Sequence, residues 1–276
     1  MKKISAVLIS FNEEEKIEDA LSSLRGIADE IIVVDSFSSD RTPEICRRFT
    51  EHVIQREWPG YRAQKQFATD QASHPWVLSL DCDERLSADL RSELRDWKRR
   101  PEGPEKGYAI PRQTYFMGRW IRHTTWYPDL QMRLFRPDSG RWRGGRVHES
   151  FRLKNGTVQG RLGGHILHFT YSDLSEYLGQ LDRFSSLAAA DYLDRGKGVG
   201  PLRVALTPPL VFLKNYILRR GFLDGRAGLA VSFLSAVSVL FKHLKLWELR
   251  GRGPKKQRPR SNSQGSPGQT GGGRTR

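Results

Sequence analysis

Short apolar runs and amphipathic segments alternate along the first hundred residues. The runs at Ile4–Ser10, Glu30–Asp35, 52–56 and 76–80 have the near-continuous hydrophobic character of strands buried on both faces. Each is followed by a helical pattern: Asn12 is expected to cap the first helix, Thr42-Pro43 to open the second, residues 61–72 to form the third, and Ser87 to cap a fourth that reaches about Arg99. Four strand–helix units in succession predict a parallel, doubly wound sheet with helices on both faces.

The pattern changes after Gly107. Residues 107–168 form short, aromatic-rich extended pieces, which indicate mixed or antiparallel strands that complete the sheet. Asp173 is expected to start a helix that reaches about Leu193, and apolar stretches follow at 206–218 and 227–246. The run AGLAVSFLSAVSVLF is shorter than the roughly 20 residues of a membrane span, so it predicts an interfacial or packed helix. The expected division is an α/β domain over 1–170, a helical region over 171–249 and a disordered basic tail over 250–276.

The net charge of +15 predicts a negatively charged partner. Much of this charge lies in the polybasic tail, which suits an anionic membrane surface, although a solvated tail without a partner fits the composition equally well. Two distant cysteines, Cys46 and Cys82, form no disulfide framework and favour a reducing compartment. The apolar N-terminal run stops at Asn12 without a small-residue cleavage site, so we interpret it as a strand and expect a cytoplasmic protein.

Acidic residues follow the fourth predicted strand, in the sequence Asp81-Cys82-Asp83-Glu84. In an extended segment, residues two apart point the same way, so Asp81 and Asp83 are expected to converge. Their mutual repulsion is relieved by a cation between them, and oxygen ligands favour Mg²⁺ or Mn²⁺, which typically also bind substrate phosphates. An ordinary acidic turn after a strand is the structural alternative, and an EF-hand is excluded because its later ligands and glycine are absent.

The other strand ends carry polar groups that suit a nucleotide. Ligands of parallel sheets bind beyond the carboxyl ends of the strands. The residues that we assign to donor binding are accordingly Ser10, Asn12, Glu13, Asp35, Ser38, Lys65, Asp81 and Cys82. Asp35 suits ribose or base contacts, and Lys65 lies on a helix face from which it reaches the diphosphate or base, unless it is a solvated surface charge. The segments after the first two strands, 10–13 and 35–40, lack the glycine patterns of dinucleotide folds and P-loops, which argues against hydride and phosphoryl transfer.

Two other functional classes fit parts of the sequence. A basic nucleic-acid-binding protein fits the charge and the arginines interleaved with aromatic residues between Tyr108 and Trp142. However, the chain shows no known nucleic-acid motif, and such a module leaves the acidic cluster unexplained. A nucleotidyltransferase shares the sheet and the metal carboxylates but usually has a glycine-rich basic loop after the first strand, where this chain has ISFNEEE.

The motifs VLISFNEEEKI, IIVVDSFSSDRT, AQKQFA and WVLSLDCDE together resemble the N-terminal half of family 2 glycosyltransferases with the GT-A fold. Downstream, YPDLQMRLFR, RWRGGRVHESF, HILHFTYSDLSEYL and YILRRGFLDGRAGL resemble bacterial lipopolysaccharide core glucosyltransferases, and the resemblance covers about residues 3–249. It implies inverting transfer of a sugar, with glucose from UDP-glucose as the best match, to an inner-core hydroxyl. UDP-galactose or an N-acetylated sugar fits the same motifs. A polyprenyl phosphate or peptide acceptor stays open within the family.

The resemblance also implies roles for individual residues. Glu149, in the VHE motif, corresponds to the catalytic base, with Asp129 as its rival, and His148 orients the base or touches the acceptor. Arg133 or Arg136 binds the donor diphosphate or an acceptor phosphate. His168 completes the shell of a Mn²⁺ or Mg²⁺ ion held by Asp83 and Asp81, whereas His165 lies on the opposite face of its strand. The implied partners are a nucleotide-sugar, a lipid-linked saccharide and an anionic membrane surface at the inner face of the cytoplasmic membrane, and no nucleic acid.

Overall fold

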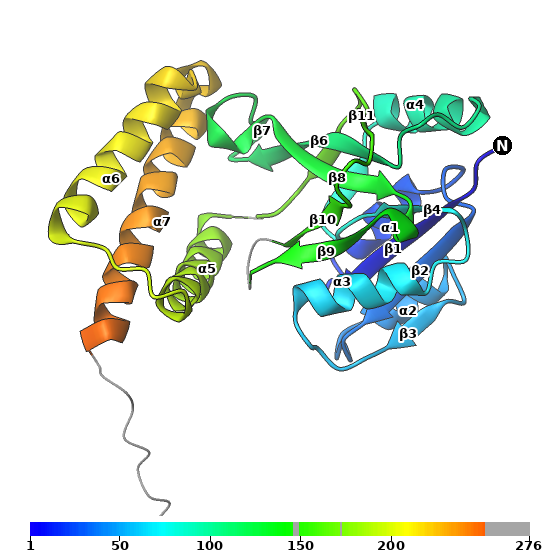
Figure 1. Cartoon of the computed structure of the whole chain (residues 1–276), viewed down its shortest axis with the longest axis horizontal. Helices are drawn as coiled ribbons and strands as arrows, with labels where there is room; N and C mark the ends of the chain where they lie inside the picture. Colours follow the sequence, from blue (N-terminus) through cyan, green and yellow to red (C-terminus); the bar gives the residue numbers. More distant parts are fainter. Residues whose placement is uncertain (146–148, 172, 252–276) are drawn as a thin grey trace, which may run out of the picture.

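The protein consists of a sheet domain and a lobe of long helices beside it (Figure 1). The computed structural model describes residues 1–145, 149–171 and 173–251. The predicted basic tail therefore lies outside the described residues from position 252 onward.

The first four strands form the predicted parallel sheet, in the order β3-β2-β1-β4. They are β1 (Ile4–Ser10), β2 (Glu30–Asp35), β3 (Val53–Gln55) and β4 (Trp76–Ser79). The intervening helices are α1 (Ile17–Ser23), α2 (Thr42–Arg47), α3 (Tyr61–Asp70) and α4 (Ala88–Arg99). Ser87 caps α4 as expected, because its hydroxyl accepts a hydrogen bond from the Leu90 N–H at 3.1 Å.

Both faces of this sheet are buried, which explains why its strands read as unbroken apolar runs. Ile4, Ala6 and Leu8 of β1 pack into one core with side chains of α1 and α4. The alternate residue Val7 packs on the other face with Ala68 of α3 and aromatic residues of the later strands.

The second half of the sheet is mixed, as the change in pattern predicted. Its path continues β4-β8-β6-β12-β5, with β8 antiparallel to both β4 and β6. The strands are β5 (Glu84–Leu86), β6 (Gly107–Phe116), β7 (Arg119–Trp120), β8 (Asp129–Phe135), β11 (Gln159–Arg161) and β12 (Ile166–His168). A separate antiparallel ribbon pairs β9 (Gly140–Gly144) with β10 (Glu149–Leu153). Short 3₁₀ turns, η1 (Thr124–Trp126) and η2 (Pro137–Ser139), join these strands.

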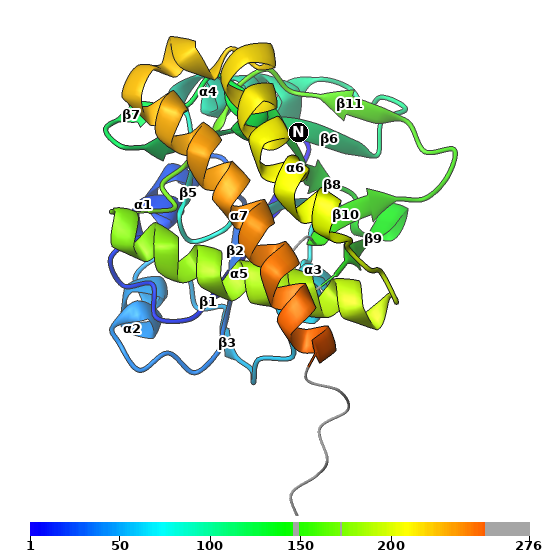
Figure 2. The same cartoon turned by 90° about the vertical axis from the view of Figure 1, so that its left-hand side faces the viewer.

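The C-terminal lobe contains α5 (Leu174–Asp194), α6 (Pro201–Leu213) and α7 (Gly225–Gly251), with the short helical turns η3 (Lys214–Leu218) and η4 (Gly221–Asp224) between α6 and α7. Asp173 caps α5 as predicted, through a 2.8 Å hydrogen bond from the Glu176 N–H. In Figure 2, α6 and α7 lie side by side in front, and α5 crosses behind α7.

One segment of the described chain, Gly221–Gly251, is long and apolar enough to cross a membrane, with a mean hydropathy of 1.6. Its apolar window is 39% buried inside the protein, and the core helix of a soluble protein would pass the same test of length and composition. The apolar run of about fifteen residues thus lies within a helix of 27 residues, longer than the run itself indicated.

The start of the first helix differs from the prediction. Asn12 has a positive φ of 54° and does not cap a helix, and α1 begins only at Ile17 after a turn. Asn12 instead contacts the loop after β2: its N–H donates to the Ser38 hydroxyl at 2.8 Å, and its side-chain oxygen accepts from the Ser39 N–H at 2.9 Å. The left-handed backbone, which Asn tolerates better than most residues, turns the chain toward that loop.

Candidate active site

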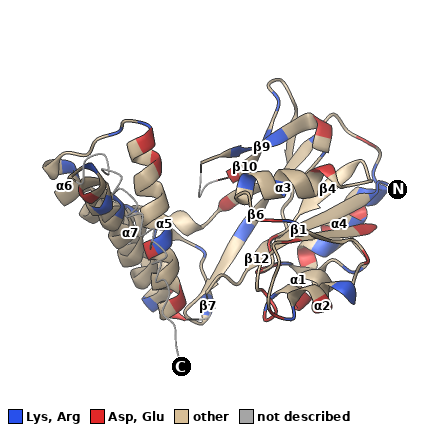
Figure 3. Ribbon diagram, turned by 90° about the horizontal axis from the view of Figure 1, so that it is seen from below, with Lys and Arg blue, Asp and Glu red and all other residues tan. Residues whose placement is uncertain are grey.

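A cavity of about 540 Å³ lies at the carboxyl ends of β1 and β4. Its walls include Glu13, Lys65, Asp81, Cys82, Asp83, Arg133, Glu149 and His168. Gln180 and Phe184 of α5 line it from the helical lobe. The cavity is therefore bounded by both parts of the molecule, which Figure 3 shows side by side.

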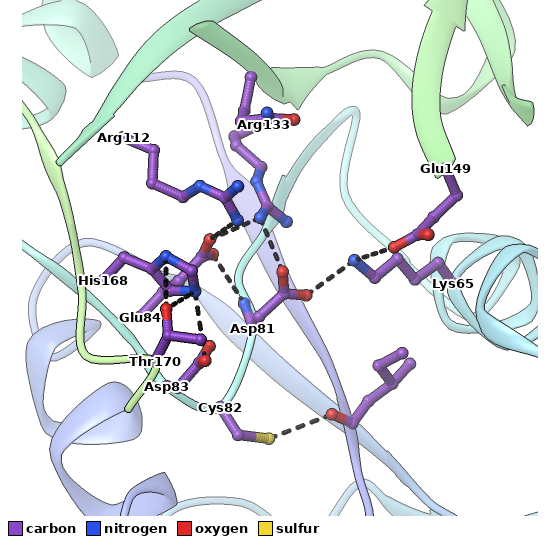
Figure 4. Close-up of polar contacts among 12 residues, drawn as sticks. Lys65, Asp81, Cys82, Asp83, Glu84, Arg112, Arg133, Glu149, His168 and Thr170 are labelled. Carbon is purple, nitrogen blue, oxygen red and sulfur yellow. Dashed lines mark hydrogen bonds and ion pairs between the residues drawn. The ribbon is translucent and has the colours of Figure 1, made fainter. Parts of the chain in front are cut away.

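Asp81 is held by two cations at the wall of this cavity. Its Oδ1 lies 2.9 Å from Lys65 Nζ and its Oδ2 lies 2.7 Å from an Nη of Arg133 (Figure 4). Burial opposes its ionisation, but Arg133 and Lys65 together keep the pKa of Asp81 well below its ordinary value. Asp81 is thus a charged, fixed group with its oxygens already paired.

The two aspartates line the same cavity but contact different partners. Residues 81–84 form a turn in which the Glu84 N–H donates to the Asp81 carbonyl oxygen at 3.0 Å. The chain is therefore not extended there, and the rule that alternate residues share a face does not apply. Asp83 turns instead toward His168, with 3.2 Å between its Oδ2 and the histidine Nε2.

Asp83 and His168 are the candidate ligands for a divalent ion, and their role as ligands stays a prediction. Burial opposes ionisation of Asp83, but the neighbouring His168 lowers the pKa of this carboxyl below its usual value. The Thr114 hydroxyl lies 3.3 Å from His168 Nδ1, and the Thr170 hydroxyl lies 2.8 Å from Nδ1 and 2.7 Å from Nε2. No cluster of three metal-ligating side chains occurs within residues 1–145, 149–171 and 173–251. A site with few protein ligands fits Mg²⁺ or Mn²⁺, which complete their coordination with water and substrate phosphates.

Glu84, which we did not assign to the site, forms buried ion pairs with two arginines, Arg112 and Arg133. Its side chain is fully buried, and its Oε1 lies 2.6 Å from Arg133 and 3.3 Å from Arg112. Arg112 also pairs with Asp129 at 2.7 Å. This arrangement holds Arg133 between two carboxylates, so its main contacts are within the protein, although its Nε and Nη1 have no partner among the described residues. A phosphate-binding role for Arg133 stays a prediction.

Lys65 connects the donor side of the cavity with Glu149. Its ammonium lies 2.9 Å from Asp81 and 3.0 Å from Glu149 Oε1, and its side chain is only 8% exposed. Burial disfavours the charged amine, but Asp81 and Glu149 raise the pKa of Lys65 above its ordinary value. Glu149, at the start of β10, is therefore held at the cavity wall, whereas the rival base Asp129 is bound to Arg112 and Gln131 and lies outside the cavity lining.

Four of the predicted donor-binding residues lie outside the cavity lining: Ser10, Asn12, Asp35 and Ser38. Asp35 is fully buried and accepts hydrogen bonds from the Ser10 hydroxyl at 2.9 Å and from the Ser38 hydroxyl and N–H at 2.5 and 2.9 Å. These contacts shape the loop after β2. A direct role in nucleotide contact stays a prediction for them.

Cys82 and His165 contact groups other than the candidate metal ligands. Cys82 is buried, and its thiol donates to the Ile9 carbonyl oxygen at 3.1 Å, away from the Asp83–His168 pair. His165 contacts the Tyr127 hydroxyl at 2.9 Å, so the two neighbouring histidines have different partners. His148 lies outside the described residues.

Glu13 provides a test of the electrostatics of the cavity. Burial and the nearby Asp83 carboxylate raise the pKa of Glu13 to about 7. Because the folded state then binds a proton that the unfolded chain releases above pH 4.5, this residue stabilises the fold below that pH, and the contribution is lost as the pH rises to about 7 and beyond. In metal-free buffer, Glu13→Gln is therefore expected to raise the melting temperature relative to the unmodified chain progressively between pH 5 and 8.

The control for this experiment is Glu15→Gln, which changes an exposed residue of the same segment. If the melting temperatures of the Glu13→Gln variant and the unmodified chain differ by the same amount at pH 5 and pH 8, Glu13 is not perturbed in this way.

The chain is similar to known proteins over most of its length. The family model described as "Glycosyl transferase family 2" matches residues 5–142, half of the chain. A lipopolysaccharide core biosynthesis glycosyltransferase of Rhizobium meliloti (LpsC) is 29% identical over 253 residues, covering 87% of this chain and 93% of that protein. An uncharacterised glycosyltransferase of Rickettsia typhi is 30% identical over 267 residues, covering 90% and 88% of the two chains.

Among solved structures, a mannosyltransferase from Pyrobaculum calidifontis in complex with GDP-Man and Mn²⁺ covers 92% of this chain and 81% of its own, with 14% identity and a TM-score of 0.48. The similarity to the family model and the near-complete overlap with the curated relatives lead to one assignment: the chain is a glycosyltransferase and belongs to glycosyl transferase family 2.

Proposed function

We propose that the protein transfers glucose from UDP-glucose to a hydroxyl group of a lipopolysaccharide inner-core saccharide, with inversion at the anomeric carbon. The observation that carries this proposal is one cavity that contains both a Mg²⁺- or Mn²⁺-type donor set, Asp83 and His168, and a separate carboxylate, Glu149. The similarity to a lipopolysaccharide core biosynthesis glycosyltransferase over 87% of the chain supports the acceptor class.

In this proposal, each of the polar residues in the cavity has a separate role in the reaction. Glu149 accepts the proton of the acceptor hydroxyl, whose oxygen then forms a bond to the anomeric carbon as the bond from that carbon to the diphosphate breaks. Asp83 and His168 would hold the divalent ion, which when bound stabilises the negative charge of the departing diphosphate. Lys65 keeps Glu149 oriented toward the cavity.

The site of action follows from the same proposal. The acceptor is lipid-linked, and nucleotide-sugar and acceptor meet at the inner face of the cytoplasmic membrane. Cys46 and Cys82 are both buried free thiols, which supports the cytoplasm as the compartment.

A thermal-shift panel with UDP, GDP, CDP, ADP and TDP, each with and without Mn²⁺, tests the donor site. UDP with Mn²⁺ is expected to raise the melting temperature, since a ligand at about 100 times its Kd adds roughly 2.7 kcal/mol to the free energy of unfolding. Asp83→Ala is expected to lose the metal-dependent shift.

Stabilisation by another nucleoside diphosphate would replace UDP in the proposal, and no shift with any of the five would contradict a metal-dependent donor site. The acceptor is tested separately, by transfer from UDP-glucose to an inner-core saccharide, a polyprenyl phosphate and a peptide. Product from either of the last two alone would exclude the lipopolysaccharide acceptor.

A further inference from the structure

A large part of the exposed apolar surface is concentrated on the outer helices of the C-terminal lobe. On α6 and η3, five exposed side chains recur at intervals of three or four residues and so form one stripe: Leu202, Leu206, Leu210, Leu213 and Ile217. Leu202 is 71% and Leu210 61% exposed. A stripe of this kind normally packs against a neighbouring element, but here each of its side chains is at least 46% exposed.

The apolar surface continues around the turn into α7. Leu218, Phe222 and Leu223 are exposed between the two helices, and Leu229 and Phe233 follow on the first turns of α7. We call this set of exposed apolar residues, from Leu202 to Phe233, the outer face. Figure 2 shows the two helices that carry most of these residues, α6 and α7, in front of α5 and the sheet domain.

Basic residues accompany the outer face, and acidic residues do not. Arg203, Lys214, Arg219, Arg220 and Arg226 are all exposed. Within the described stretch 201–247 the only acidic residue is Asp224, which is 1% exposed and bonded to the N–H groups of Arg122 and His123. The surface is therefore both apolar and positively charged.

We propose that the outer face of α6 and α7 docks shallowly on the surface of an anionic lipid bilayer. Exposed leucine and phenylalanine side chains beside arginine and lysine form the pattern of helices that lie in a membrane interface, where the apolar groups enter the acyl boundary and the cations meet lipid phosphates. A second copy of the chain is a poorer occupant, because it would bring two surfaces of the same positive charge together.

The packing of α7 favours docking on the surface over crossing the bilayer. Its inner side is fixed to α5, where Lys245 donates hydrogen bonds to Asp182 Oδ1 at 2.6 Å and to the hydroxyls of Ser185 and Ser186 at 2.8 Å. These partners of Lys245 lie on α5, the helix that also lines the active-site cavity. One face of α7 therefore packs on the protein, which leaves the other face for lipid. The proposal that the outer face docks on a membrane does not depend on which sugar and acceptor the enzyme uses.

Co-sedimentation of the full chain with vesicles tests this proposal. Binding is expected to vesicles of phosphatidylglycerol and phosphatidylcholine, to weaken as salt is raised, and to be much weaker for pure phosphatidylcholine. The double variant Leu206→Gln/Leu210→Gln is expected to reduce the partition coefficient at least about tenfold, because two apolar side chains no longer enter the bilayer.

The matched control is Leu174→Gln/Leu178→Gln, two exposed leucines four residues apart on α5 that lie outside the outer face. Both double variants are first checked for an unchanged melting temperature. Equal binding by the Leu206→Gln/Leu210→Gln variant and the unmodified chain would overturn the proposal, and so would equal losses in the two variants. A concentration-dependent dimer in light scattering, absent in the Leu206→Gln/Leu210→Gln variant, would assign the outer face to a second copy instead.

Discussion

Glu149→Gln is expected to lower kcat by about 10²- to 10⁴-fold, the range that general acid–base catalysis typically contributes. The amide keeps the size of the side chain and an oxygen that accepts from Lys65, which lies 3.0 Å from Glu149 Oε1. It cannot take a proton from the acceptor hydroxyl. In the proposed function, Asp83 and His168 hold the divalent ion of the donor, so the variant is expected to keep the metal-dependent thermal shift while steady-state transfer is lost.

Asp129→Asn is the matched comparison, since Asp129 is the other carboxylate that the sequence offered as base. Its oxygens are 2.7 and 2.6 Å from Arg112 and Gln131, and it lies outside the cavity lining. Its loss is expected to change kcat far less. Near-normal transfer by the Glu149→Gln variant, together with inactivity of the Asp129→Asn variant, would reverse the assignment.

Arg133→Met is expected to lower the free energy of unfolding by about 3–5 kcal/mol, the cost of removing one partner from a buried ion pair. The guanidinium is 4% exposed and lies 2.7 Å from Asp81 and 2.6 Å from the fully buried Glu84. Methionine fills much of the volume but leaves Glu84 with the longer ion pair to Arg112, at 3.3 Å, as its remaining contact with a cation, beside the hydrogen bond from the Asp81 N–H. Urea unfolding followed by circular dichroism measures the change.

Arg136→Met provides the control, because it removes the same charge three residues further along the chain. Arg136 contacts Glu102 at 3.3 Å and Asp138 at 3.6 Å, in pairs whose acidic partners are largely exposed. Such pairs contribute little, so its loss should change stability by about 1 kcal/mol or less. Similar changes in the two variants would mean that the buried network does not depend on Arg133.

The parallel half of the sheet could be predicted because its signals are local. Apolar runs, helical spacing and the capping residues Ser87 and Asp173 each act within a few positions, and the structure confirms them. The position of α1 was wrong because the positive φ of Asn12 depends on contacts with the loop 36–40, which no local pattern encodes.

The sequence predicted which residues line the candidate site, but not which ion pairs they form. Asp81, Asp83, Lys65, Glu149 and His168 do gather around one cavity. The arginines that pair with Asp81 and Glu84 come from the second half of the sheet: Arg112, a partner of Glu84, lies on β6, and Arg133, a partner of both, lies on β8. Antiparallel register brings these cations next to Glu84, and sequence spacing carries no record of that register.

The contribution of α5 to the cavity has a consequence for how such enzymes diversify. The match to the family model ends at residue 142, before Glu149, His168 and the helix that carries Gln180 and Phe184. The part of the chain that matches the family model therefore supplies the β4 side of the cavity, and later residues, including Gln180 and Phe184 of α5, supply other parts of its wall. Exchange of α5 between relatives is therefore expected to alter the wall formed by Gln180 and Phe184, while Lys65 and Asp83, which lie within the family match, are kept.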